Sequence, residues 1–262
     1  MPTKIEWTEE VWNPITGCTK ISEGCKYCYA ERFAKRMAGR FGYPKDNPFQ
    51  ITFHRDKISM PIRWRKSRKV FLCSMGDLFH EDVLFEWIDE VMSWISAGWW
   101  HVFFILTKRP QRMYEYFKKE PSARLSKIPQ NVWLGVSVEN QRWANQRIPL
   151  LLQTGDENTK RFVSIEPMLG PIDLTFLKAD GFVVDALSGR NGAFEPIHPS
   201  DRKLNWVIVG GETGPRARLM NPDWARSIRN QCEAAGVPFF FKQMSKREPI
   251  PEDLQIRQFP QT

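Results

Sequence analysis

The sequence lacks any continuous apolar run of about 18 residues, the length that a helix needs to cross a membrane. Its opening residues, MPTKIEWTEE, contain no apolar core of the kind found in secretory signal peptides. No Gly/Ser- or Pro-rich linker, low-complexity run or internal repeat divides the 262 residues. These absences argue against a membrane span and a secretion signal, so we expect a cytoplasmic protein with one large domain.

Cysteine is also scarce, with five in the chain, and three of the five fall within eleven residues. Cys18, Cys25 and Cys28 lie in the run GCTKISEGCKYCYAE, with the spacing C-x6-C-x2-C. In a reducing compartment, clustered cysteines are typical of metal sites rather than of disulfides. Three thiolates can hold three corners of a [4Fe–4S] cluster and leave one iron open to a substrate or a second cofactor.

Two other interpretations of these cysteines remain open. A structural zinc site normally takes four ligands from cysteine and histidine. The sequence has no second C-x2-C pair, and its four histidines are scattered at His54, His80, His101 and His198. The cysteines could also be unrelated core residues. We favour the cluster and keep, as an alternative function, a nucleic-acid binding protein with structural zinc.

The chain carries a surplus of basic residues, 38 Lys and Arg against 30 Asp and Glu. The formal net charge of +8 suits a polyanionic partner such as nucleic acid. Charge alone does not identify the partner, because many basic enzymes never contact nucleic acid.

Short apolar runs alternate with amphipathic segments along the chain. The runs predict six strands, at 70–74, 101–106, 132–137, 161–165, 206–210 and 237–241. Each run is almost continuously apolar, which is typical of a parallel sheet buried on both faces. Helices are predicted at 29–39, 79–95 and 221–235. Alternating strands and helices indicate an α/β fold.

Polar side chains follow nearly every predicted strand. Because ligands bind at the carboxyl ends of strands in parallel α/β folds, we expect these side chains to converge on one site. A partial (β/α)6 barrel of the TIM type gathers six strand ends better than an open sheet does. We expect this barrel over residues 1–245, with insertions near 40–67 and 176–203, the second a long loop or lid, and a C-terminal tail at 246–262.

The run Cys25-Lys26-Tyr27-Cys28 resembles the second half of the radical S-adenosylmethionine (SAM) motif, CxxxCxΦC, in which an aromatic residue precedes the last cysteine. Tyr27 takes the aromatic place. The first gap is six residues here and three in the common motif, so a longer loop must bulge between Cys18 and Cys25. The resemblance implies a barrel of the radical SAM kind, a [4Fe–4S] cluster on the three cysteines, and SAM on its open iron.

A wider resemblance covers about residues 10–245. It is carried by eight ordered runs: WNPITGC, GCKYCYAERFA, SMGDLFHE, ILTKRPQRM, NVWLGVSVEN, SIEPMLGPI, WVIVGGETGPRAR and FFFKQ. These runs resemble a three-cysteine family of phage and bacterial proteins of unknown function, of the phage Gp37/Gp68 type. That family is placed beside the radical SAM proteins, as distant kin of spore photoproduct lyase.

The resemblance implies roles for the strand-end residues. It implies cofactor binding by Tyr27, Ser74, Gly76, Asp77, Ser137 and Glu139. Their places at predicted strand ends make Lys108, Glu166, Gly210, Gly211 and Glu212 further candidates for cofactor binding, and Arg216, Arg218, Lys242 and Gln243 candidates for substrate binding. From the residues alone, Asp77 fits a helix cap equally well, and Lys108 and Arg109 fit either an anion site or solvated charge. The run Gly210-Gly211-Glu212 is by itself weak evidence for phosphate binding.

These observations predict a radical SAM enzyme that is a lyase, an isomerase or a transferase. A reductant would supply one electron, and the 5′-deoxyadenosyl radical would abstract hydrogen from the substrate. The basic charge and the resemblance favour a nucleic-acid base or nucleotide as substrate, in DNA modification or repair. If the protein is encoded by a phage, it would act in the host cytoplasm. A radical SAM enzyme acting on a peptide or a small metabolite is the second alternative.

Overall fold

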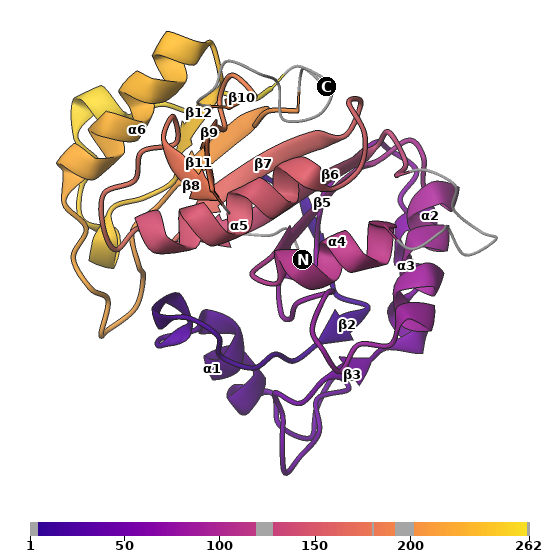
Figure 1. The fold of residues 1–262 in the computed structure, drawn as a ribbon. Helices are drawn as coiled ribbons and strands as arrows, with labels where there is room; N and C mark the ends of the chain where they lie inside the picture. Colours follow the sequence, from indigo (N-terminus) through magenta and orange to yellow (C-terminus); the bar gives the residue numbers. More distant parts are fainter. Residues whose placement is uncertain (1–4, 119–127, 180, 192–201, 261–262) are drawn as a thin grey trace. The chain divides into compact units, whose positions relative to one another are not determined.

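The computed structural model describes residues 5–118, 128–179, 181–191 and 202–260. The chain divides into two compact units, Met1–Leu134 and Gly135–Thr262, which are described separately here. The prediction of a single domain over 1–245 stays a prediction. Figure 1 shows the course of the chain through its helices and strands.

The first unit is built on parallel strands, and most of their apolar side chains are buried. These are β1 (Glu10–Trp12), β4 (Lys69–Leu72) and β5 (Val102–Thr107). Phe71 on β4 lies opposite Val11 on β1 and Phe104 on β5. The sequence predicted β4 and β5 but missed β1, because only three residues pair there and they do not form an apolar run.

Helices of the first unit follow these strands and the cysteine segment. They are α1 (Tyr29–Arg36), α2 (Met60–Arg63), α3 (Phe85–Ala97) and α4 (Pro110–Lys118). The region 40–67, expected as an insertion, also carries β3 (Thr52–Phe53), which pairs with β2 (Ile15–Thr16), and the short helix η2 (Arg55–Lys57).

Helix α3 begins six residues later than the predicted start at residue 79. Side chains hold the segment before it in turns. The Asp77 carboxylate accepts the backbone N–H of Phe79, and Nδ1 of His80 accepts that of Asp82. These bonds satisfy N–H groups that a helix would otherwise have to pair, so the chain reaches Phe85 before the helix begins. Helix α1 likewise ends at Arg36, short of the predicted 39.

The second unit contains parallel strands and two long helices. Its strands are β7 (Lys160–Ile165), β11 (Trp206–Val209) and β12 (Phe239–Phe241), and its helices are α5 (Gln141–Gln153) and α6 (Pro222–Ala235). The side chain of Asn221 caps α6, and Gly236 ends it with φ of 64°. A positive φ of this kind favours glycine, so the predicted end of this helix is confirmed.

The predicted loop at 176–203 is wrong for the part that the structure describes. An antiparallel sheet is formed there by β8 (Leu177–Ala179), β9 (Phe182–Asp185) and β10 (Arg190–Asn191). Leu177 and Val184 lie opposite each other and are fully buried, which explains why this segment pairs. Residues 180 and 192–201 lie outside the described part of the chain.

Residues 246–260 are ordered against β12 rather than extended away from it. Leu254, in the short helix η4 (Glu252–Leu254), is fully buried. The backbone N–H of Phe241 donates to Ile256, and that of Gln258 donates to Phe239. The segment expected as a tail therefore pairs with β12 through backbone hydrogen bonds and an antiparallel bridge between Phe240 and Arg257.

The parallel strands follow the order β1-β4-β5 in the first unit and β7-β11-β12 in the second, and β6 (Val132–Val138) spans the division between the units. All six strands predicted from apolar runs are present in this order, and the predicted parallel α/β class is confirmed. In the described part of the chain, no helix combines the length and apolar character needed to cross a membrane.

Candidate functional site

Cys18 is held close to the carboxyl end of β4. The preceding Gly17 has φ of 94°, and its N–H donates to the carbonyl of Met75. A Cβ atom at Gly17 would lie 2.1 Å from the carbonyl oxygen of Gln50, so no other residue fits there without a shift of the backbone. The local glycine thus allows the cysteine segment to pass between β4 and residues 47–51.

Cys25 and Cys28 lie at the entrance to α1. Cys25 ends the short helix η1 (Glu23–Cys25), and Cys28 is the residue immediately before α1. All three cysteines of the segment are free thiols and partly exposed, whereas Cys73 and Cys232 are buried. The partly exposed thiols are therefore those that the spacing predicted as ligands.

The pKa values of the Cys18 and Cys25 thiols are shifted in opposite directions. Burial, with the nearby charge of Asp77, raises the pKa of the Cys18 thiol to about 12. Burial also acts to raise the pKa of Cys25, but the charge of Lys108 and hydrogen bonds from the backbone of Ile21 and Ser22 outweigh it. The pKa of Cys25 therefore lies below its ordinary value, which favours the thiolate that binds metal.

The donor set fits an iron–sulfur cluster in number and in kind. Three free thiols lie on one segment. The charge of Lys108 lowers the pKa of Cys25, and that of Arg109 partly offsets the rise in the pKa of Cys18. In position the fit is incomplete: among the residues that the structure describes, no three His, Cys, Asp or Glu side chains are gathered as a metal site. The cysteine segment would have to draw together around a bound cluster.

Asp77 lies between the ends of β4 and β5 and is almost fully buried. One carboxylate oxygen accepts from the N–H of Phe79 and the hydroxyl of Thr107, at 3.0 and 2.7 Å. The other accepts from the N–H of Lys108 and from Nη1 of Arg109, both at 3.2 Å. The capping interpretation is thus part of what Asp77 does, and a cofactor amino group would compete with these four donors.

The other predicted cofactor residues of the first unit have partners within the protein. The Ser74 hydroxyl donates to Oδ1 of Asn13, and its carbonyl accepts from the hydroxyl of Tyr29. Gly76 permits a close backbone approach, as expected, but the neighbour is Gly17, whose oxygen would lie 2.9 Å from a Cβ there. Tyr27 packs under the ammonium group of Lys26.

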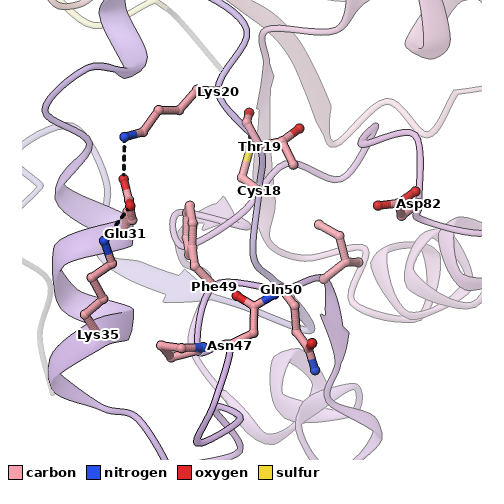
Figure 2. A pocket seen from close by; sticks show the side chains of 11 residues that line it. Cys18, Thr19, Lys20, Glu31, Lys35, Asn47, Phe49, Gln50 and Asp82 are labelled. Carbon is pink, nitrogen blue, oxygen red and sulfur yellow. Dashed lines mark hydrogen bonds and ion pairs between the residues drawn. The ribbon is translucent and has the colours of Figure 1, made fainter.

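A cavity of about 480 Å³ opens beside Cys18, within the size range of small-molecule sites. Figure 2 shows Lys20 and Lys35 meeting at Glu31 on one side of it, with Asp82 on the other side. The two ion pairs measure 2.9 and 2.7 Å. Residues 47–51 form another wall, so the region expected as an insertion helps to shape this cavity.

In the second unit, three strand ends meet at Glu166. Lys242 Nζ donates to both carboxylate oxygens of Glu166, at 2.8 and 3.0 Å. The side-chain amide of Gln243 donates to Glu166 and to the carbonyl of Gly211. The ends of β7, β11 and β12 are thereby joined, so the predicted convergence of Glu166, Gly211, Lys242 and Gln243 is present in this unit.

Glu139 is fully buried and paired within its own unit. Its carboxylate lies 3.1 Å from Nη1 of Arg147, which also donates to the carbonyl of Ser137. The Arg147 guanidinium stacks on the ring of Trp143. The Ser137 hydroxyl donates to the carbonyl of Glu166. The predicted contact of Glu139 with a cofactor would require it to leave this ion pair, which favours a structural role.

The Gly-rich turn after β11 is closed by an ion pair. Glu212 accepts from the backbone N–H, Nε and Nη2 of Arg218, the last at 2.6 Å. Of the two arginines predicted to bind substrate, Arg218 therefore has much of its charge neutralised, whereas Arg216 is exposed. Gly210 donates its N–H to Ile165 and continues the ladder.

The two glycines of this turn differ in how closely other atoms approach. A Cβ at Gly211 would lie 2.3 Å from the backbone nitrogen of Ser245, whereas a Cβ at Gly210 would first meet the flexible amide of Gln243 at 3.2 Å. We expect Gly211→Ala to lower the free energy of unfolding by about 1–3 kcal/mol, and Gly210→Ala to cost clearly less. Urea unfolding of the two variants tests this, and equal losses would contradict it.

Sequence reasoning missed the central role of Arg109. The sequence suggested either an anion site or a solvated charge for Arg109. The residue is instead buried and forms ion pairs with Asp77 and Glu81. It also contacts Cys18 and Thr19, about 90 positions earlier in the chain. Only its place at a predicted strand end suggested any role.

The fold resembles solved structures of spore photoproduct lyase. A cysteine-to-serine mutant of that enzyme aligns with a TM-score of 0.54 at 12% identity. The alignment covers 92% of the present chain and 78% of the chain of the mutant enzyme. The complex with dinucleoside spore photoproduct gives a TM-score of 0.46 at 12% identity. The alignment covers 83% of the present chain but only 58% of the chain in that complex. At 12% identity the likeness to the cysteine-to-serine mutant shows the fold alone, and it confirms the predicted partial barrel.

The sequence comparisons add a family. The model of a family described as "Protein of unknown function (DUF5131)" matches residues 2–254. No curated protein matches the sequence. The family description names no reaction, so the chemistry has to be argued from the residues of this chain.

Proposed function

We propose that this chain, which belongs to the DUF5131 family of proteins of unknown function, is a radical SAM enzyme. One observation carries the proposal: three free, partly exposed thiols lie within eleven residues, on a segment that passes the end of a parallel strand. The aromatic residue before Cys28 and the fold likeness to spore photoproduct lyase support it.

In this proposal Cys18, Cys25 and Cys28 hold a [4Fe–4S] cluster. When bound, such a cluster with SAM supplies a 5′-deoxyadenosyl radical after one-electron reduction by an external reductant. The lowered pKa of Cys25 favours its thiolate, the form that binds iron. The cations at 108 and 109 offset the negative charge of the thiolate ligands.

Cofactor binding is assigned to the polar groups near the strand ends. In the first unit these are Tyr27, Ser74, Gly76, Asp77 and Lys108, and in the second they are Ser137, Glu139, Glu166, Gly210, Gly211 and Glu212. Asp77 and Glu166 are the carboxylates assigned to a cationic group of the cofactor, which would have to displace a donor that each now holds, such as Arg109 or Lys242. Glu139 is the least suitable, because it is fully buried.

A nucleic-acid base or nucleotide is the proposed substrate, in modification or repair of DNA. The net charge of +8 supports this, with Arg216, Arg218, Lys242 and Gln243 as contacts. Encoding by a phage, action in the cytoplasm, and the choice among lyase, isomerase and transferase belong to the same proposal.

The chemistry is tested by anaerobic reconstitution with iron and sulfide. We expect about four irons per chain, and formation of 5′-deoxyadenosine and methionine on addition of dithionite and SAM. The products are measured by liquid chromatography and mass spectrometry. A chain that binds one zinc and leaves SAM intact would contradict the proposal and favour the structural-zinc alternative.

The substrate class is tested by the salt dependence of binding to a labelled single-stranded DNA. Each phosphate contact contributes a slope of about −0.7 in log K against log salt. We expect Arg216→Ala to reduce the slope by about one such contact. Arg226→Ala serves as the control, because Arg226 is already paired with Asp223 and Asp253. Salt-independent binding, or an equal effect of both variants, would contradict a nucleic-acid substrate at this turn.

A further inference from the structure

Arg109 is a buried arginine that uses every nitrogen of its side chain. Its Nε donates to both carboxylate oxygens of Glu81, at 2.9 and 2.8 Å. Its Nη1 donates to Asp77 at 3.2 Å and to the sulfur of Cys18 at 3.4 Å. Its Nη2 donates to the carbonyl and the hydroxyl oxygen of Thr19, at 3.2 and 2.9 Å. The guanidinium thus joins the ends of β4 and β5 to the cysteine segment.

His80 holds Thr19 from a second direction. Its Nδ1 accepts the backbone N–H of Asp82, so the ring proton lies on Nε2 in the neutral form. Nε2 is 2.8 Å from the Thr19 hydroxyl oxygen and donates to it. His80 is 2% exposed and Arg109 is 6% exposed, so the exposed Thr19 is anchored by two buried donors. The six-residue gap begins at this anchored position.

We propose that Arg109 is a positioning residue for Cys18. This inference rests on the proposed function, in which Cys18 is a ligand of the cluster. Arg109 fixes the first of the three ligands against the strand ends, whereas Cys25 and Cys28 lie at the entrance to α1. A guanidinium fork suits this task because its donors have fixed directions. This anchor explains the six-residue gap between Cys18 and Cys25. Cys18 is held near the ends of β4 and β5, and the chain needs these residues to reach the start of α1.

The position of Arg109 has an electrostatic consequence for a bound cluster. Hydrogen bonds to cluster sulfurs and nearby positive charge favour the reduced state, which carries one more negative charge. Loss of Arg109 therefore shifts the reduction potential to more negative values. A residue that served only to pack the fold would leave this potential unchanged.

The first arm of the test uses the full chain without cofactor and measures hydrogen–deuterium exchange. The amides of Gly17 and Cys18 donate to Met75 and Phe49, and the anchored segment keeps them protected. We expect Arg109→Met to speed exchange in the peptide covering these two amides. Arg112→Met is the matched control, because Arg112 donates to the carbonyl of Val83 and packs over Phe85. Unchanged exchange in Arg109→Met would overturn the positioning role.

Thr19→Val provides a second variant in case Arg109→Met does not fold. It removes the hydroxyl that Arg109 and His80 hold, yet leaves the pair of Arg109 with Asp77 in place. The same faster exchange is expected, and normal protection in a folded Thr19→Val protein would count against the anchor.

The second arm measures the midpoint potential of the reconstituted protein by redox titration. Arg109→Met is expected to lower the potential, whereas Arg109→Lys, which keeps the charge, should stay closer to the unaltered protein. Equal potentials in all three would overturn the electrostatic role. If no cluster forms in the unaltered chain, the proposed function fails, and the exchange arm still decides whether Arg109 anchors Cys18.

Discussion

Replacement of Cys18, Cys25 or Cys28 by alanine is expected to reduce formation of 5′-deoxyadenosine from SAM by more than about 100-fold. Even groups that only support a metal ligand typically cost 10- to 100-fold when removed, and these residues would be the ligands themselves. The iron content should fall in each variant. Because all three side chains are partly exposed, we expect little change in the free energy of unfolding without cofactor.

Cys232→Ala is the matched control for the three variants. Cys232 lies on α6, is fully buried, and has its thiol pKa raised to about 12 by burial. A buried thiol of this kind is inert, so the variant should keep its iron and its product. Full activity in any one of the three cysteine variants would contradict the assignment of that residue as a ligand.

Glu139→Gln is expected to lower the free energy of unfolding by about 3–5 kcal/mol. The side chain of Glu139 is 0% exposed and that of Arg147 is 2% exposed. The change therefore leaves the charge of Arg147 buried without a carboxylate partner. A buried charge that loses its partner is costly because the interior cannot replace the hydration that the ion gave up on folding. Denaturant unfolding followed by circular dichroism measures the loss.

A double variant separates this structural role from cofactor binding. Glu139→Leu with Arg147→Met removes both charges and should recover most of the lost stability, because replacing a whole buried pair by apolar groups is often neutral. Asp223→Asn, in the exposed pair with Arg226, is the control and should change stability little. A stable Glu139→Gln protein with impaired SAM cleavage would instead support the predicted contact with the cofactor.

The strands and the cysteine segment were predictable because their signals are local. A buried parallel strand is apolar along its length, so the runs that became β4, β5, β6, β7, β11 and β12 stand out in the sequence. The three cysteines were likewise evident from spacing. Segments without a local signal were missed: β1 contains only Glu10–Trp12, and residues 177–191 contain glycine, which suggested a loop.

The partners of the strand-end residues could not be predicted, because they depend on contacts between distant positions. Arg109 reaches Thr19 across 90 residues, and Lys242 reaches Glu166 across 76. The sequence placed Arg109, Glu166 and Lys242 at strand ends but gave no means of telling a ligand-binding charge from one already paired. For Glu139, burial and the pair with Arg147 make that distinction.

The most direct test of the central claim is electron paramagnetic resonance of the reconstituted, dithionite-reduced protein, with and without SAM. The account predicts the signal of a [4Fe–4S]⁺ cluster whose shape changes when SAM is added, because the cofactor occupies the open iron. A protein with no such signal, or a cluster signal that SAM does not alter, would contradict the assignment of Cys18, Cys25 and Cys28 to a SAM-binding cluster.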